Sequence, residues 1–157
     1  AQVFGKEVLR DVDKEEFIRS IPSLREKLDD RCVLRALHFF KENERVKEQV
    51  EALRRSDFAG FLELVKASGD SSFKYLQNIY TNHDVQHQSM SVALALSEDI
   101  LGENGVCRVH GGGFAGTIQA FVRNSFVKEY KEKIESVFGE GACHVLKIRT
   151  YGGIQVM

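Results

Sequence analysis

A glycine-rich hexapeptide is the part of this chain best suited to chemistry. Gly111-Gly112-Gly113-Phe114-Ala115-Gly116 lies between two apolar segments, residues 106–110 and 117–122. Glycine allows sharp turns and positive φ, and it leaves backbone N–H groups open to a bound anion. The segment therefore predicts a ligand-binding loop. A hairpin connection without a ligand is another ordinary use of the same residues.

Two familiar binding patterns overlap at this loop, and its flanks argue against both. Gly111, Gly113 and Gly116 have the spacing of the dinucleotide fingerprint, but that pattern needs a helix after its last glycine, and residues 117–122 alternate as a strand. The run from His110 to Gly113 matches the oxyanion-hole motif of some esterases, which also requires a serine within G-x-S-x-G. No such serine motif occurs in the sequence.

Two polar side chains beside the loop could contact an anion. Arg108 and His110 are two residues apart on a predicted strand, so they share the face opposite Cys107 and Val109. The alternatives are a surface ion pair for Arg108 and a partly exposed strand end for His110. We name both as possible anion contacts.

Other polar residues are weaker candidates. His83 and His87 have the spacing of a zinc-peptidase motif on a predicted helix, but Asp84 stands where that motif has glutamate, and no third ligand is evident. We therefore expect no metal site. A further polar group is expected on the exposed face of a long helix: His38, Asn43, Glu44 and Arg45.

Composition excludes several classes of protein. The chain has 157 residues, 43% of them hydrophobic, which suits one domain spanning residues 1–157. Its net charge of -1 argues against a nucleic-acid surface, and no apolar stretch is long enough to cross a membrane. The cysteines are odd in number and lie in apolar segments, so we expect buried, reduced thiols and a cytoplasmic protein.

Hydrophobic periodicity divides the chain into a helical first half and a mixed second half. The expected helices cover residues 13–22, where Pro22 interrupts the first, 24–55 with one internal break, 57–69, 85–101 and 125–138. The expected strands cover residues 106–110, 117–122, 143–149 and 154–157. One apolar stripe is expected to face the core: Leu37, Phe40, Val46, Val50 and Leu53. These elements predict an α+β domain with a small, mainly antiparallel, ferredoxin-like sheet and helices packed on one side.

The long helical segment resembles a motif of the galactokinases. From Arg35 to Val46 the sequence reads R-x-x-H-x-x-x-E-N-x-R-V, and an Ala-Leu pair and Asp57 follow at the galactokinase spacing. The glycine loop resembles the third motif, close to G-G-G-F-G-G, of the superfamily that contains galactokinase, homoserine kinase, mevalonate kinase and phosphomevalonate kinase. With both motifs in the right order, the chain resembles the C-terminal domain of a galactokinase. It departs from the pattern at Ala115, where glycine is usual, and over residues 68–88, which leaves N-acetylgalactosamine or another hexose open as the substrate.

The resemblance implies a function for a longer protein. Galactokinases transfer the γ-phosphoryl of ATP, with Mg2+, to the anomeric hydroxyl of galactose, and residues 111–116 would form one wall of the cleft near that phosphate and the sugar. Family members carry the nucleotide and sugar motifs and the catalytic aspartate in an N-terminal domain that is absent from this chain. We therefore expect no catalytic residue within residues 1–157, no activity of this part alone, and binding of hexose and ATP through the N-terminal domain.

The sequence supports two further expectations. Without an N-terminal domain, exposed apolar surface makes self-association of this part plausible. The alternative function, from a different class, is a stand-alone α+β module that binds an anion or a partner through residues 111–116 without catalysis.

Overall fold

The fold is known from a computed structural model that describes residues 1–113, 116–148, 150–151 and 155. Its helices are α1 (Lys14–Lys27), α2 (Asp30–Arg54), α3 (Phe58–Ser71), α4 (Ser89–Leu101) and α5 (Val127–Phe138). The strands β1 (Gly105–Val109) and β2 (Ile118–Val122) form an antiparallel sheet, and the π turn η3 (Ser72–Leu76) extends α3. The predicted α+β class, with helices packed on a small antiparallel sheet, is confirmed.

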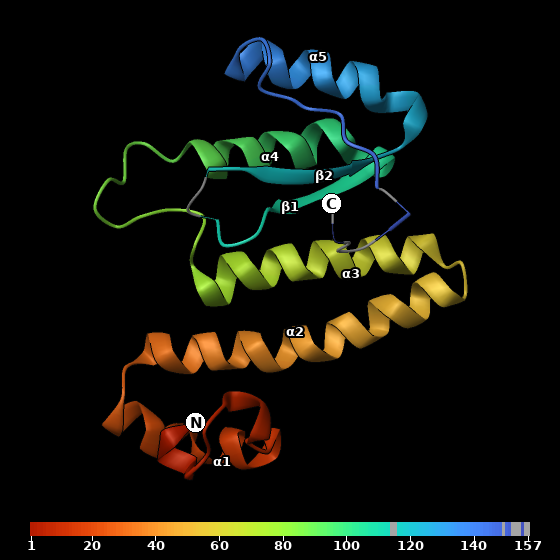
Figure 1. The fold of residues 1–157 in the computed structure, drawn as a ribbon. Coiled ribbons are helices and arrows are strands. Elements are labelled where there is room, and N and C mark those ends of the chain that lie inside the picture. The colour runs from red at the N-terminus through yellow and green to blue at the C-terminus, as the bar shows by residue number, and fades with distance from the viewer. Residues whose placement is uncertain (114–115, 149, 152–154, 156–157) are drawn as a thin grey trace.

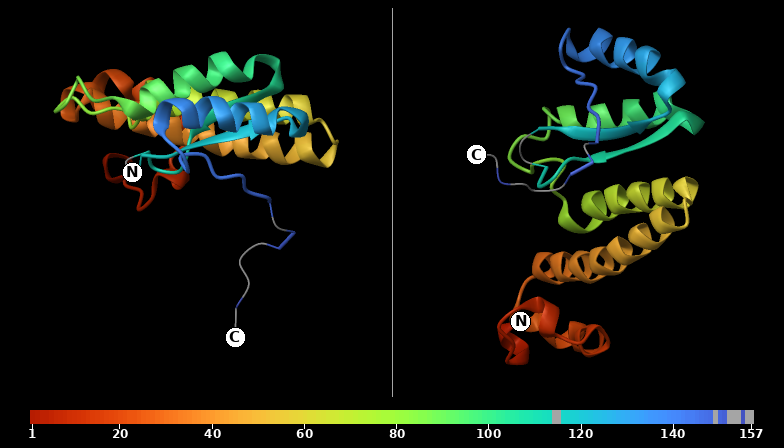
Figure 2. Two further views of the ribbon diagram at one scale, coloured as in Figure 1. Left: turned by 90° about the horizontal axis from the view of Figure 1, so that it is seen from above. Right: turned by 45° about the vertical axis from the view of Figure 1, so that its right-hand side comes forward.

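The elements are arranged in layers, and the strands lie between α3 and α4 although α4 precedes them in the sequence (Figure 1). The helices α1, α2 and α3 come first, the two strands lie next, and α4 and α5 complete the stack (Figure 1). The same order is visible from a second direction, in the right panel of Figure 2. Contacts join α2 to α3, α3 to β1, α4 to both strands and α4 to α5. The strand β1 is thus held between helices from both halves of the chain.

Aspartate side chains cap three of the helices. The Oδ1 atoms of Asp13, Asp29 and Asp57 accept hydrogen bonds from backbone N–H groups three residues later, at 2.8, 2.7 and 2.9 Å. Such caps satisfy N–H groups that the first turn of a helix leaves unpaired. The starts predicted at residues 13 and 57 are confirmed, and the break predicted within residues 24–55 lies between α1 and α2.

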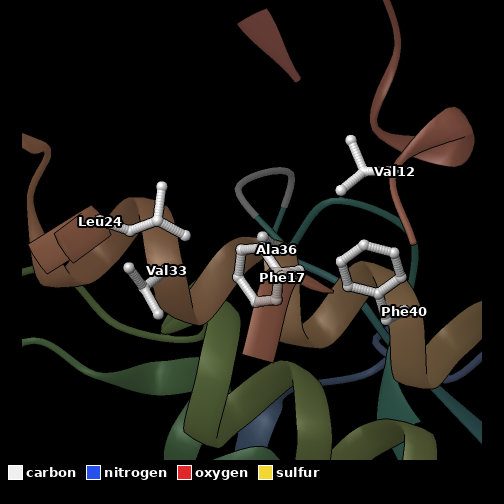
Figure 3. Close-up of a cluster of buried hydrophobic side chains, with 6 residues drawn as sticks. All are labelled: Val12, Phe17, Leu24, Val33, Ala36 and Phe40. Atoms are coloured by element: carbon white, nitrogen blue, oxygen red, sulfur yellow. The ribbon is translucent and has the colours of Figure 1, made fainter. Parts of the chain in front are cut away.

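The first helix runs through Pro22, so the predicted interruption there is wrong. Proline removes one backbone hydrogen bond within a helix and strains the preceding turn. Phe17 and Leu24 are nevertheless seven residues apart on one face of α1, and both are buried. They pack with residues of α2 in the cluster that Figure 3 shows: Val12, Phe17, Leu24, Val33, Ala36 and Phe40. This packing on both sides of Pro22 keeps the helix continuous.

The hairpin of β1 and β2 carries the second core. Cys107 and Val109 are buried, whereas Val106 and Arg108 between them are only partly covered, which confirms the predicted alternation. Cys107 packs in a cluster with residues of α4 and α5, and Val109 packs with Ile79 and Met90. The end of β1 that leads into the glycine loop is therefore fixed by buried contacts.

The strand predicted over residues 143–149 is not formed in its described part, residues 143–148. The backbone of Cys143 is bound to side chains of α5 instead. Lys131 Nζ donates to the Cys143 carbonyl at 3.1 Å, and Glu135 Oε1 accepts from Gly141 N at 2.9 Å. These contacts hold the chain against the helix. The strand predicted over residues 154–157 falls almost entirely outside the described residues, as does Arg149.

Several boundaries and exposures also differ from expectation. The helix predicted from residue 85 begins at Ser89, and α5 begins without the predicted side-chain cap, because Asn124–Phe126 forms a 3-10 turn that leads into it.

Three members of the expected apolar stripe are exposed, since α3 covers a different face of α2: Val46, Val50 and Leu53. In the described part of the chain, no helix has the length and apolar character needed to span a bilayer.

The expectation of buried thiols holds for one cysteine and fails for another. Cys107 is buried, and burial raises the pKa of its thiol to about 12. Cys32 is exposed at the start of α2, where its backbone N–H donates to the capping Asp29. Cys143 is half-buried. No cysteine among the described residues forms a disulfide.

Candidate functional site

The glycine loop connects the two strands of the hairpin. The strand register pairs Gly105 with Val122 and Val109 with Ile118, and it continues into the loop through a hydrogen bond from His110 N to the Thr117 carbonyl at 3.0 Å. The loop lies at the end of the sheet near the segment that leads into α4 (Figure 1). Of the predicted site residues, Phe114 and Ala115 lie outside the described part of the chain.

The loop backbone takes conformations that favour glycine. Gly111, Gly113 and Gly116 have φ values of 59, 84 and 76°. Residues with a Cβ are strained in this region, so these three positions need glycine. Gly113 N donates to the His110 carbonyl at 3.4 Å, and Gly116 N donates to the Gly113 carbonyl at 3.0 Å. The predicted turn with positive φ is therefore confirmed at these positions.

The described part of the loop has an exposed side and a buried side. Gly111 and Gly112 are exposed, and a Cβ added at either would meet open space. Among the described residues, their N–H groups donate to no hydrogen-bond partner. Gly113 is buried, and a Cβ there would lie 2.3 Å from the backbone carbonyl oxygen of Asn78. The N–H groups without a described partner thus belong to the exposed glycines, while Gly113 anchors the loop.

Asn78 contacts the loop although it lies outside the sequence motifs that point to the site. Its Nδ2 donates to the Gly112 carbonyl at 3.0 Å, and the residue is 6% exposed. Asparagine is common in turns, and the sequence around residues 78–82 carried only that signal. The contact with Gly112 joins positions 34 residues apart. It depends on the path of the chain after η3, which places Asn78 beneath the loop.

Arg108 and His110 face different surroundings. Arg108 Nη1 donates to Ser68 Oγ at 2.6 Å, and burial lowers the pKa of its guanidinium. His110 is exposed beside the loop, with Nδ1 3.5 Å from Thr117 Oγ1. The structure therefore turns Arg108 toward α3 and leaves His110 at the solvent side of the loop.

A buried polar network ties α2, α3 and β1 together. Ser68, which is 1% exposed, donates to Glu42 Oε2 at 2.7 Å while it accepts from Arg108. Glu42 also forms an ion pair with Arg45 on the same helix. Gly69 lies so close to β1 that an added Cβ would be 2.9 Å from the Cβ of Arg108. One serine hydroxyl thus connects a carboxylate of α2 with the strand that enters the loop.

The predicted exposure of the polar residues on α2 is correct for Glu44 and wrong for Arg45. Glu44 is exposed and pairs with Lys14 at 2.7 Å, but the side chain of Arg45 is only 13% exposed. His38 and Asn43 are half-buried. Because α3 packs against α2, it supplies Ser71 as the polar partner of His38, whereas Asn43 bonds to the Phe39 carbonyl and Arg45 pairs with Glu42 within α2. In the sequence, the R-x-x-H-x-x-x-E-N-x-R-V pattern was the signal that could have indicated these inward polar side chains.

His38 has an environment that opposes protonation. Its Nδ1 lies 2.9 Å from Ser71 Oγ. Burial lowers the pKa of His38 below the ordinary value of 6.5, and the positive charges of Arg45 and Arg108 lower it further. The unfolded chain therefore binds a proton at this histidine more readily than the folded chain does. Stability contributed by His38 is present above pH 6.5 and is lost as the pH falls below it.

We expect His38→Asn to reduce the loss of stability between pH 7.5 and pH 5.5, because asparagine can bond to Ser71 Oγ without taking up a proton. Urea denaturation of the wild type and the variant at the two pH values measures this difference. The exposed His83 provides the matched control as His83→Asn. An equal pH dependence in wild type and His38→Asn would contradict the assignment.

The predicted helix that carries His83 and His87 is not formed. Both histidines lie in an irregular segment, and α4 begins after them, at Ser89. His87 Nδ1 lies 2.8 Å from Asp84 Oδ2, and both side chains are substantially exposed. Within the described ranges, no group of three or more histidine, cysteine, aspartate or glutamate residues could hold a metal ion.

The fold and the site define an α+β domain that presents a braced, glycine-rich hairpin loop with two open backbone amides. Comparison with known proteins shows similarity to galactokinases. The chain is 34% identical over 134 residues to a galactokinase of Glaesserella parasuis serovar 5 (strain SH0165). It is 31% identical over 134 residues to galactokinases of Actinobacillus pleuropneumoniae serotype 5b (strain L20) and of Haemophilus influenzae (strain ATCC 51907 / DSM 11121 / KW20 / Rd).

Each match covers 85% of this chain but 33% of the relative, so the chain spans about a third of the length of the galactokinases that it matches. No protein-family model matches the chain. The resemblance to the C-terminal domain of a galactokinase, drawn from the two sequence motifs, is confirmed by these relatives.

Proposed function

We propose that residues 1–157 are the C-terminal domain of a sugar kinase that transfers the γ-phosphoryl of ATP to the anomeric hydroxyl of galactose or a related hexose. The observation that carries this proposal is the similarity to galactokinases over 85% of the chain. The loop geometry supports it, because an exposed pair of glycine amides suits contact with a phosphate.

In this proposal, Gly111 and Gly112 face the cleft, and Gly113 with Asn78 forms the support behind them. Phosphoryl transfer depends chiefly on positioning and on stabilising charge at the phosphate oxygens, which fixed backbone amides can provide. His110 is the candidate for a direct anion contact, since it is exposed next to these amides. Arg108 would contribute a nearby positive charge while it remains bound to Ser68.

The reaction also needs groups that we do not assign to residues 1–157. We assign the catalytic base and the contacts to Mg2+ to the N-terminal domain, as the resemblance to galactokinases implies. In the complete protein, ATP with Mg2+ would supply the transferred phosphoryl, and the N-terminal domain would supply the remaining contacts to nucleotide and hexose. Free thiols among the described cysteines fit a cytoplasmic enzyme.

An ATP-dependent phosphorylation assay tests this function. We expect the complete protein to convert galactose to a sugar 1-phosphate, detected by 31P NMR, and residues 1–157 alone to convert no hexose. N-acetylgalactosamine and glucose, assayed beside galactose, would define the substrate.

Two outcomes of this assay would contradict the proposal. Failure of the complete protein to phosphorylate any hexose would favour an anion-binding module without catalysis. Turnover by residues 1–157 alone would show that the catalytic groups lie within this part.

A further inference from the structure

Asn78 holds the glycine loop at two adjacent positions. Its side-chain Nδ2 donates to the Gly112 carbonyl at 3.0 Å. Its backbone carbonyl oxygen lies against Gly113, where an added Cβ would approach to 2.3 Å. The orientation of the amide follows from the first contact, because the reverse orientation would place two oxygen atoms together. Asn78 thus contacts the loop from the buried side, behind the exposed amides.

The segment that carries Asn78 is itself fixed. Ile79 is 5% exposed and packs with Val109 and Met90 beneath the loop. Gln77 has a φ of 52°, which is uncommon for a residue with a side chain, and its N–H donates to the Ser72 carbonyl at 3.0 Å. A conformation of this kind persists only where the surrounding contacts impose it. Asn78 therefore connects the loop to a rigid part of the core.

The side chain of Asn78 uses only part of its hydrogen-bonding capacity, so it contributes little to the stability of the fold. Its Oδ1 is buried and has no hydrogen-bond partner in the part of the chain that the structure describes. A buried acceptor without a partner costs stability and offsets much of what the bond from Nδ2 contributes. Loss of the side chain should consequently alter the stability of the fold little and the geometry of the loop strongly.

We propose that Asn78 is a positioning residue that fixes the peptide between Gly112 and Gly113, so that the exposed amides of the loop meet the transferred phosphate. The kinetic consequence rests on the proposed kinase function, whereas the geometric consequence does not. Asn78 acts only through the loop and contacts no reacting atom. Nothing in the sequence motifs of the loop or of α2 includes this residue.

The test compares Asn78→Ala with Asn82→Ala in the complete protein. Asn82 is the matched control, since it is exposed and its side chain makes no hydrogen bond to the described residues. We expect Asn78→Ala to lower kcat about tenfold to a hundredfold, as misplacement of positioning groups does, with KM values for hexose and ATP close to those of the wild type. The melting temperature should change little. Hydrogen exchange of the bonded amides of His110 and Gly113 should become faster in Asn78→Ala and stay unchanged in Asn82→Ala.

Two outcomes would overturn the inference. One is unchanged exchange of the His110 and Gly113 amides in Asn78→Ala. The other is a loss of activity that follows a lowered melting temperature, which would assign Asn78 to the stability of the fold. If the wild-type protein phosphorylates no hexose, the proposed function fails, and the exchange comparison still decides whether Asn78 positions the loop.

Discussion

Gly113→Ala is expected to lower the kcat/KM of the complete protein about a hundredfold, because a displacement of about 1 Å at a positioning element has effects of that size. The new Cβ would lie 2.3 Å from the Asn78 carbonyl oxygen, at a φ of 84°. Backbone atoms cannot yield as a flexible side chain can, so the loop must move away from Asn78. The left-handed conformation adds strain of about 1–2 kcal/mol for alanine. Together with the overpacking, we expect a loss of stability of about 3 kcal/mol.

Gly112→Ala is the matched control for this variant. Gly112 is the adjacent glycine, it lacks a left-handed φ, and a Cβ there would meet open space. Thermal unfolding monitored by circular dichroism should therefore give Gly112→Ala the melting temperature of the wild type and give Gly113→Ala a clearly lower one. Equal melting temperatures for the two variants would contradict the contact between the loop and Asn78.

Ser68→Ala should destabilise the chain by about 2 kcal/mol, because removal of one hydroxyl leaves polar partners on both sides unsatisfied. Ser68 accepts from Arg108 at 2.6 Å and donates to Glu42 at 2.7 Å, and it is 1% exposed. Alanine fills almost the same volume, so packing is preserved while the connection between α2 and β1 is lost. Urea denaturation followed by circular dichroism measures the free energy of unfolding.

Ser136→Ala is the control for Ser68→Ala, since this serine is exposed and bonds only to a carbonyl of its own helix. We expect a change within about 0.5 kcal/mol there. A double-mutant cycle with Arg108→Met would add the pair energy between Ser68 and Arg108. Additive effects of the two substitutions would contradict a direct interaction through the hydroxyl.

Much of the fold could be predicted because its signals are local. Aspartate caps, the 3.6-residue period of the helices and the alternation from residue 106 to residue 122 are read within a few positions. Pro22 was misread because the packing of Phe17 and Leu24 against α2 outweighs the cost of a proline within the helix. The strand expected from residue 143 is not formed, because side chains of α5 take the backbone hydrogen bonds of Gly141 and Cys143.

The candidate site divides in the same way. The glycine loop can be recognised in the sequence, because backbone positions with positive φ favour glycine. Asn78 and Ser68 could not be recognised, because each acts through partners 34 and 40 residues away, Gly112 and Arg108. The burial of Arg45 depends on how other elements pack against α2, which the helical period of α2 does not encode.

Hydrogen exchange of the glycine loop in the complete protein, with and without ligands, tests the central claim most directly. If the loop forms a wall of the phosphoryl-transfer cleft, the exposed amides of Gly111 and Gly112 should be protected when saturating hexose and a nonhydrolysable ATP analogue with Mg2+ are bound. Residues 131–138 of α5, distant in sequence from the loop, provide the internal reference. Unchanged exchange of residues 110–113 in a protein that phosphorylates the hexose would contradict the assignment of this loop to the active site.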